Sequence, residues 1–323
     1  APSSPRQLLQ KISLLMRRLL KSKVASLGGT QVIALAGFLL VTGNIAFYQK
    51  LSWTYPLSLE NVGFLASLAV LVCALTVLLY SLISLFIGSH LAAMTLVLIT
   101  CFAGYFTDKF GIVMDYTMLD NVLQSNTDEA FGLLSFSLLA RILILAVVPI
   151  IIVSRLPTIQ MSRWRAWRHA SLLGCSALMI IGISLATFSA EYASFFREHK
   201  PIRYYANPVN PIFALSKFTY RLFTTPTDST LATLMENVQP AVAVGTPKLM
   251  VMVVGETARS DRFSINGYER ETTPGLANEP GVVSYTGVES CGTSTAISVP
   301  CMFAAAGRDD FDISTSRHTE NVL

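Results

Sequence analysis

The feature that most constrains this chain is a long stretch without formal charge. Residues 61–107 contain no Asp, Glu, Lys or Arg. A helix needs about 20 apolar residues to cross a hydrocarbon core of about 30 Å, so this stretch is long enough for two crossings. Gly88-Ser89-His90, in its middle, is typical of a tight turn. The sequence therefore predicts two spanning helices joined by a hairpin, at about 62–87 and 91–107.

Three further apolar runs predict spans at about 31–49, 136–154 and 170–190. The composition agrees, because 52% hydrophobic and 14% charged residues leave too few charges to cover a soluble domain. Arg141 lies within the fourth run, where we expect it to extend its guanidinium to water near the outer headgroups. The fold predicted for residues 1–190 is a five-helix transmembrane domain.

The charged residues between the spans predict their orientation. Basic residues precede the first span and fill the fourth loop: Arg6, Lys11, Arg17, Arg18, Lys21 and Lys23, then Arg155, Arg163, Arg165 and Arg168. Such loops stay cytoplasmic, whereas the acidic loop between the third and fourth spans then faces outward. The basic residues behind the net charge of +4 lie beside the spans, where they would contact anionic headgroups. We therefore expect membrane lipids as partners and no nucleic acid.

Residues 191–246 contain Asn207-Pro208 and scattered aromatic residues, which predict a linker with short interfacial helices. Residues 249–254 then form an apolar run typical of a buried strand, and Glu256 follows at its carboxyl end. In open α/β sheets, ligands and metals gather at that edge. Glu256 is therefore a candidate metal ligand, with a helix cap or a surface carboxylate as the alternative.

A second candidate site lies between Cys291 and Cys301, in a polar segment rich in Gly, Ser and Thr. The two cysteines could close a short loop as a disulfide, which would place the segment in an oxidising compartment. Hydroxyl residues here precede a predicted helix, where a nucleophile gains from the positive end of the helix dipole. Thr295 would need a nearby cation to lose its proton, and otherwise such residues serve as helix caps.

Several of these motifs occur together in one known family. They are Tyr204-Tyr205-Ala206-Asn207-Pro208, Gly255-Glu256-Thr257-Ala258-Arg259, Asn266-Gly267-Tyr268, the segment from Cys291 to Met302-Phe303, and Glu320-Asn321-Val322-Leu323. With the five-span layout, they resemble the N-terminal part of the lipid A phosphoethanolamine transferases, which include the colistin-resistance enzymes. The resemblance covers nearly the whole chain. It implies that residues 247–323 begin an α/β alkaline-phosphatase/sulfatase-like periplasmic domain, incomplete in this chain.

The resemblance also implies roles for residues of this domain. Thr295 would accept the phosphoethanolamine group and contact a Zn²⁺ ion, and Glu256 would be a zinc ligand. Cys291 and Cys301 would form the disulfide. Because the family's other zinc ligands lie beyond Leu323, we expect this polypeptide to be an inactive fragment by itself.

Three polar residues of the outer loop would bind the donor headgroup on the family's pattern. They are Asn121, Ser125 and Glu129, whose i, i+4, i+8 spacing places them along one helix face. Ser125 replaces the Thr more usual there, which keeps the hydroxyl but loses a methyl group. Without the resemblance, an exposed polar face of an interfacial helix is the alternative.

The activity implied is transfer of phosphoethanolamine from phosphatidylethanolamine to lipid A through a covalent intermediate on Thr295, at the bacterial inner membrane. Core sugars, other glycans or surface proteins remain alternative acceptors. A glycerol-phosphate or other phosphoalcohol transferase of the same superfamily would share the spans and the threonine. A non-catalytic membrane protein, such as a transporter, is a third possibility, although transporters usually place charges or broken helices at the midplane.

Overall fold

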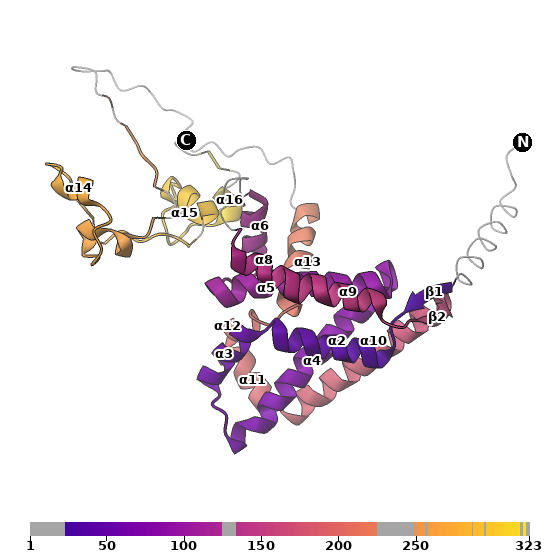
Figure 1. Cartoon of the computed structure of the whole chain (residues 1–323). Coiled ribbons are helices and arrows are strands. Elements are labelled where there is room, and N and C mark those ends of the chain that lie inside the picture. The colour runs from indigo at the N-terminus through magenta and orange to yellow at the C-terminus, as the bar shows by residue number, and fades with distance from the viewer. Residues whose placement is uncertain are drawn as a thin grey trace, which may run out of the picture. The chain divides into compact units, whose positions relative to one another are not determined.

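A computed structural model of the chain describes most of its length and divides it into two units (Figure 1). The described residues are 23–124, 134–224, 249, 251–255, 258–285, 287–293, 295–316 and 319–320. The first unit is Ala1–Phe223 and the second is Thr224–Leu323. Most of the basic residues that precede the first span, from Arg6 to Lys21, lie outside the described residues.

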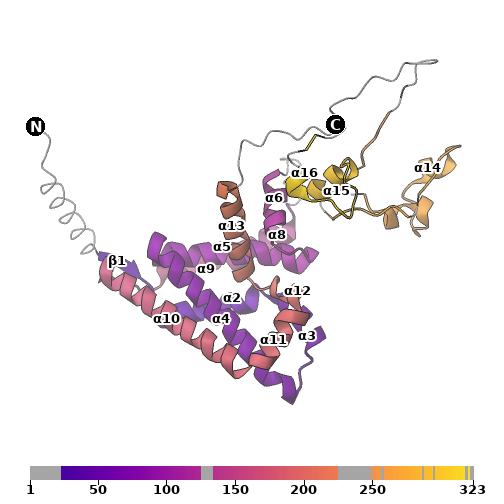
Figure 2. The same cartoon turned by 180° about the vertical axis from the view of Figure 1, so that it is seen from behind.

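The first unit is built from apolar helices, seen from two sides in Figures 1 and 2. Four segments are long and apolar enough to cross a membrane: α4 (Leu59–Ile87), α5 (Ser89–Phe110), α8–η1–α9 (Phe136–Arg155) and α10 (Arg163–Thr187). A bent pair, α2 (Gly29–Thr42) and α3 (Ile45–Thr54), forms a further apolar segment. If this pair counts as one span, the described residues contain the predicted five.

Shorter elements join and flank these helices. In the first unit they are β1 (Lys23–Ser26), α6 (Tyr116–Gln124), β2 (Ile159–Ser162), α11 (Ser189–Glu198), α12 (Lys200–Arg203) and α13 (Val209–Thr224). The segment α8–η1–α9 consists of α8 (Phe136–Ile142), a π-helical turn η1 (Leu143–Val147) and α9 (Val148–Arg155). In the second unit they are η2 (Ser260–Arg262), η3 (Ser264–Asn266), α14 (Pro274–Asn278), α15 (Thr295–Met302) and α16 (Ile313–Ser316).

The hairpin between α4 and α5 has the turn that the sequence predicts. Gly88 joins the two helices with a φ of 85°, a conformation that residues with a Cβ rarely adopt. Ser58 begins α4 at the other end, where its side chain accepts a hydrogen bond from the backbone of Asn61 at 3.3 Å. This cap satisfies one of the backbone N–H groups that a helix start leaves unpaired.

Helices α4 and α10 make the most extensive helix contact in the described structure, and they run side by side in both views. The buried residues of α10 are all small: Ala170, Gly174, Ala177 and Ser184. A Cβ added at Gly174 would lie 3.4 Å from the Cβ of Ser81 on α4. In a membrane the hydrophobic effect does not drive helices together, so close van der Waals contact through small residues carries the association.

The first span is broken at Gly43 and Asn44, where the sequence predicts one continuous helix. The axes of α2 and α3 differ by 66°. Gly43 presses against α5, since a Cβ at this position would lie 2.0 Å from the Cγ2 of Thr100. Asn44 is buried, and its amide nitrogen donates to the carbonyl oxygens of Leu39 and Asn207 at 3.2 and 3.0 Å. A tight contact and side-chain hydrogen bonds thus replace helical hydrogen bonds at the break.

Asn207 completes the pairing with Asn44 across the chain. Its backbone N–H donates to the side-chain oxygen of Asn44 at 2.8 Å, and its own amide nitrogen donates to the carbonyl oxygen of Gly43 at 3.0 Å. Both asparagine side chains are buried, so each has exchanged water for these partners. The segment after α12 is therefore fixed directly to the break in the first span.

Asp108 and Arg141 form a largely buried ion pair beside the same break. The guanidinium Nη2 of Arg141 donates to Asp108 at 2.8 Å, and the two side chains are 15% and 11% exposed. The other carboxylate oxygen of Asp108 accepts from the backbone N–H of Ala46, in the first turn of α3, at 2.9 Å. The expectation that Arg141 extends to water is wrong, because a carboxylate on the neighbouring helix neutralises it within the protein.

A two-stranded ribbon ties the start of the described chain to the fourth loop. Strand β1 pairs antiparallel with β2, with Lys23 opposite Ser162 and Ser26 opposite Ile159. Lys23, in β1, and Arg163, which follows β2, therefore lie at the same end of the first unit. This is the arrangement that their shared charge predicts.

The second unit contains turns and short helices among its described residues. Residues 251–255 are extended but exposed, with Val251 and Val253 at 75% and 86%. The predicted buried strand is thus not buried, and within the described ranges sheet pairing is limited to β1 and β2. An extended segment is covered only when neighbouring strands and helices pack on it.

Gly43→Ala tests the close contact at the break. The added methyl group meets Thr100, so we expect a loss of about 1–3 kcal/mol in stability, the usual cost of overpacking. Gly37→Ala, in the middle of α2, is the matched control because a Cβ there meets nothing within 4 Å. Thermal unfolding in detergent, followed by tryptophan fluorescence, compares the two. Equal melting temperatures for both variants would show that Gly43 is not tightly packed.

The ion pair is tested by a double-mutant cycle on Asp108→Asn and Arg141→Gln. Each single change leaves a buried partner without its counter-charge, which typically costs about 3–5 kcal/mol. The double variant should lose clearly less than the sum, because neither charge then remains. Unfolding in detergent measures all four proteins, and Arg197→Gln, in an exposed pair with Glu198, is the control. Additive losses would contradict a direct Asp108–Arg141 coupling.

Candidate functional site

The first unit contains a cavity of about 680 Å³, within the range of small-molecule sites. Much of its lining is apolar and comes from α3, α4, α11 and α13: Phe47, Leu68, Leu71, Val72, Leu75, Phe195, Phe196, Phe213 and Ala214. Several of these residues also belong to a buried cluster that packs α3, α4 and α11 together. The apolar lining is therefore held by the packing of three helices.

The whole cavity is called the donor cavity below. Polar residues line another part of it. Arg203 and Lys217 supply positive charges, and Asp115, Tyr116 and Tyr204 supply oxygen atoms. The guanidinium of Arg203 donates to the hydroxyl of Tyr204 at 3.1 Å and holds the pKa of that phenol below its usual value. Lys217 Nζ lies 4.1 Å from the ring centre of Tyr116. Positive side chains beside an apolar lining are suited to bind a molecule that has both a phosphate group and a hydrocarbon chain.

Local hydrogen bonds fix the elements around the donor cavity. The carboxylate of Asp115 accepts from the hydroxyl of Thr117 at 2.7 Å and from the backbone of Met118 at 2.8 Å, which caps α6. The amide nitrogen of Asn210, on α13, donates to the carbonyl oxygen of Met114 at 2.9 Å. Helices α6 and α13 thus hold a common position at the polar part of the cavity.

Asn121 is the described member of the predicted headgroup trio. It is half-buried on α6, which begins at Tyr116 beside the donor cavity. Ser125 and Glu129 lie outside the described residues, so the shared helix face stays a prediction. Sequence reasoning missed Arg203 and Lys217, because no local pattern shows that the two residues reach the same cavity.

In the second unit, Thr295 occupies the first position of α15 and is exposed. A disulfide joins Cys291, before the helix, to Cys301 in its last turn, with the Cα atoms 6.3 Å apart. Gly292 lies against Ile297, since a Cβ there would be 2.8 Å from the Cγ2 of Ile297. The disulfide and this close contact together hold the loop before Thr295 against its own helix.

Two further contacts close the same loop. Arg308 forms an ion pair with Glu289, which joins the segment after α15 to the segment before it. The hydroxyl of Ser290 donates to the carbonyl oxygen of Gly292 at 2.6 Å. These contacts are exposed, so they contribute little to stability and mainly restrict the conformation of the loop.

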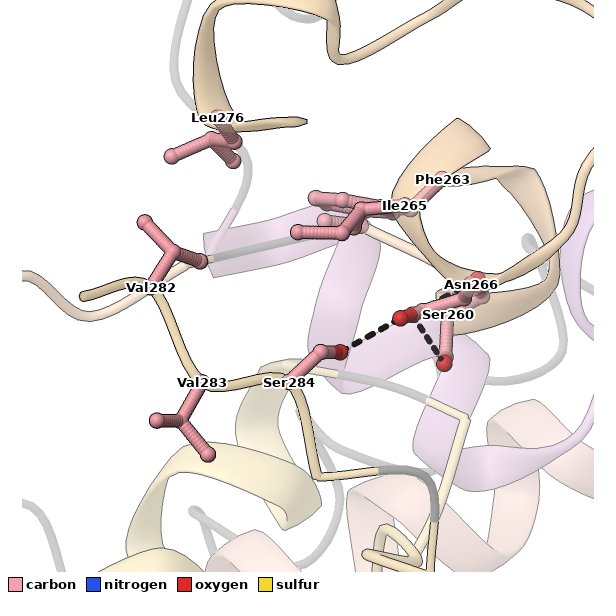
Figure 3. Close-up of a pocket in the computed structure, with 9 residues that line it drawn as sticks. Ser260, Phe263, Ile265, Asn266, Leu276, Val282, Val283 and Ser284 are labelled. Carbon is pink, nitrogen blue, oxygen red and sulfur yellow. Dashed lines mark hydrogen bonds between the residues drawn. The ribbon is translucent and has the colours of Figure 1, made fainter. Parts of the chain in front are cut away.

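The segment after residue 255 is organised by two side chains. Arg259 makes a bidentate contact with Asp261, at 2.9 and 2.8 Å, and thereby lowers the pKa of that carboxyl. Asn266 donates to the hydroxyl of Ser260 at 2.8 Å and accepts from that of Ser284 at 2.5 Å (Figure 3). Gly267 follows with a φ of 95°. The Asn266-Gly267-Tyr268 motif is therefore a structural clamp in this unit.

A depression of about 320 Å³ lies beside this clamp (Figure 3). Its lining is mostly apolar and includes Phe263, Ile265, Leu276, Val282 and Val283. The described residues that line it include no acid, base or cysteine.

The described residues do not by themselves form a zinc site. Zinc is usually held by three or four protein ligands. In the described ranges, no three His, Cys, Asp or Glu residues lie close enough together to hold a metal ion. Glu256, the predicted ligand, lies outside those ranges, so its role stays a prediction.

Peptide mapping tests the disulfide. Trypsin cleaves after Arg270 and Arg308 and nowhere between them, so both cysteines fall in one peptide, residues 271–308. In the denatured, unreduced protein we expect alkylation of Cys73, Cys101 and Cys175 only, with residues 271–308 lighter by two hydrogens than after reduction. Mass spectrometry reads both. Alkylation of Cys291 and Cys301 without a reductant would contradict the bond.

Comparisons with known proteins show which families have sequences similar to the two units. Residues 71–222 match the model of the phosphoethanolamine transferase EptA/EptB family, and residues 248–323 match the sulfatase model. Phosphatidylethanolamine transferase Mcr-1 of Escherichia coli is 39% identical over 90% of this chain and 54% of its own length. Kdo(2)-lipid A phosphoethanolamine 7''-transferase of Salmonella typhimurium is 39% identical over 24% of this chain and 14% of its own.

A solved structure gives the same result. The integral membrane protein lipooligosaccharide phosphoethanolamine transferase A (EptA) from Neisseria meningitidis superposes with a TM-score of 0.79 at 28% identity, over 91% of this chain and 55% of that one. The chain spans about half the length of the curated relatives it matches. The predicted resemblance and fold class, a membrane helical domain followed by the start of a sulfatase-like domain, are confirmed. The chain is thus similar to the phosphoethanolamine transferases along most of its length.

Proposed function

We propose that the protein transfers phosphoethanolamine from phosphatidylethanolamine to lipid A at the outer face of the bacterial inner membrane. The observation that carries this proposal is the position of Thr295, exposed at the first turn of α15 in a loop closed by a disulfide. Similarity to the family supports the reaction type. The disulfide supports a periplasmic second unit, because such bonds persist in oxidising compartments.

The donor cavity supports a lipid donor. The apolar lining around Phe47 and Leu71 would take part of an acyl chain, and Arg203 and Lys217 would attract the phosphate. Asn121, with Ser125 and Glu129, would bind the ethanolamine headgroup, where a carboxylate complements the ammonium. In this arrangement the membrane domain selects the lipid and presents its phosphate.

In the first step, the Oγ1 of Thr295 bonds to phosphorus while the bond from phosphorus to the diacylglycerol oxygen breaks. Diacylglycerol leaves with a proton, and the headgroup stays on the enzyme as a phosphodiester. The N-terminal end of α15 favours negative charge developing there. Zinc, held by Glu256 and by ligands outside the described residues, would lower the pKa of the hydroxyl.

In the second step, a phosphate oxygen of lipid A bonds to the same phosphorus and releases Thr295, which regains its proton. The related Kdo(2)-lipid A transferase supports an acceptor of this class, since it shares part of this chain's sequence. Each transfer would add a positive ammonium group to a negatively charged lipid. The physical consequence would be weaker attraction between the cell surface and cationic peptides.

Thr295→Ala tests the mechanism in a full-length transferase that contains these residues. Without the hydroxyl we expect no phosphoethanolamine adduct and a fall in turnover of at least about 10³-fold. Thr293→Ala, exposed in the same loop, is the matched control and should keep the adduct. Intact-mass spectrometry reads the adduct, and fluorescent phosphatidylethanolamine reads the release of diacylglycerol.

The donor and the metal are tested in the same assay. A fluorescent phosphatidylglycerol should release little diacylglycerol, and dialysis against a chelator should abolish turnover until zinc is restored. Turnover with phosphatidylglycerol alone would instead favour a glycerol-phosphate transferase. An adduct that persists in Thr295→Ala would place the nucleophile elsewhere.

A further inference from the structure

A second cavity lies at the ribbon end of the first unit, where α4 ends and α5 and α10 begin. Its volume is about 280 Å³, near the lower end of the roughly 300–1,000 Å³ typical of small-molecule sites. Its lining comes from β1, the α4–α5 hairpin and the first turns of α10. It shares no lining residue with the donor cavity. We call it the ribbon cavity.

The charges at this end are all positive. The described segments that form it carry Lys23, Arg155, Arg163, Arg165 and Arg168, and residues 23–29, 84–92 and 153–170 contain no Asp or Glu. Among the described residues, no carboxylate is paired with these cations.

Arg163 brings this charge to the cavity itself, and His169 adds an imidazole ring that can donate a hydrogen bond. Both line it, and Trp167 lies between them in the sequence with an indole N–H that can donate. The hydroxyls of Tyr80 and Ser89 also line it, but they bond to each other, and Ser89 accepts from the backbone of Leu27 at 2.8 Å. The groups left to meet a ligand are donors and cations, which suit a phosphate.

Apolar side chains surround the same opening. Phe86 is 87% exposed, Ile87 is 45% exposed and Trp167 is 48% exposed, and all three line the cavity. Tryptophan is enriched where the hydrocarbon core meets the headgroups. A ligand that sits here would place its polar part in the cavity and an apolar part along these side chains.

From this combination we propose that the ribbon cavity binds the headgroup of an anionic phospholipid from the adjacent leaflet, the cytoplasmic one in the orientation proposed above. The phosphate lies against Arg163 and His169, and the acyl chains lie along Phe86 and Trp167. A zwitterionic phosphatidylethanolamine fits less well, because its ammonium finds no carboxylate at this end. The site is thus distinct from that of the transferred lipid and selects for net negative charge.

The test measures lipid binding to the delipidated 323-residue protein in detergent by native mass spectrometry. Phosphatidylglycerol, phosphatidylethanolamine and phosphatidylcholine are titrated separately. We expect the ribbon cavity to bind phosphatidylglycerol at least about fivefold more tightly than phosphatidylcholine. Because phosphatidylethanolamine is also the proposed ligand of the donor cavity, its binding at the ribbon cavity is counted only as the part that Ala166→Phe removes. Inorganic phosphate at millimolar concentration should not displace it, because it lacks the apolar part.

Two variants test whether the lipid binds in the ribbon cavity. A third, the control, tests whether any basic residue at this end would have the same effect. Arg163→Gln should weaken phosphatidylglycerol binding at least fivefold, about 1 kcal/mol at RT ln 5. Ala166→Phe, which fills the cavity without a change of charge, should do the same. Arg168→Gln removes the same charge from the same helix but outside the lining, and should change binding less than twofold.

The outcomes decide the proposal. Equal losses in Arg163→Gln and Arg168→Gln would overturn it, because they would mean delocalised attraction to the whole basic end. Unchanged binding in Ala166→Phe, with an unchanged melting temperature, would also overturn it, since the lipid then lies outside the cavity. Displacement by phosphate would assign the site to a free anion instead of a lipid.

Discussion

The membrane unit depends on the way its broken first span is held. A helix interrupted within an apolar environment leaves backbone groups without partners, and each such group is costly where water is absent. Asp108 accepts from the first turn of α3, and Arg141 both neutralises that carboxylate and donates to the carbonyl oxygen of Thr42 at 3.4 Å. Asn44 and Asn207 pair beside them. The break is therefore stable only because four polar side chains from separate segments meet there.

This arrangement also supports the donor cavity. Phe47, which follows the break in α3, lines the cavity, and so does Ala206, next to Asn207. The polar contacts at the break therefore fix the position of residues on two sides of the apolar lining. The same interactions that make the bent span possible also give the cavity a defined shape.

The sequence locates the long apolar helices because hydropathy depends on local composition alone. The Gly88 turn and the resemblance to the family follow from such local patterns. Hydropathy did not report the bend at Gly43, where the chain contacts Thr100 on another helix and Asn207 far along the sequence. Arg141 was misplaced for a similar reason: its partner, Asp108, lies 33 residues away in sequence and was assigned to a loop.

In the candidate site, too, local sequence patterns were informative and contacts between distant segments were not predicted. Thr295 was predictable from the cysteine spacing and the hydroxyl residues between, which lie within one short segment. Arg203 and Lys217 were not, because they reach a common cavity only through the packing of α12 and α13 on other helices. The exposed run 251–255 shows the converse, since a local pattern typical of a strand does not supply the neighbours that bury it.

The pairing of Asn44 with Asn207 has a consequence for biosynthesis. The two residues are 163 positions apart, and all the later spans lie between them. Membrane proteins are inserted as they are synthesised, so the first span enters the bilayer before Asn207 exists. The polar groups at its break must then be satisfied in some other way, through water, lipid headgroups or a straight helix. The first helix to enter the membrane is thus among the last to reach its final geometry.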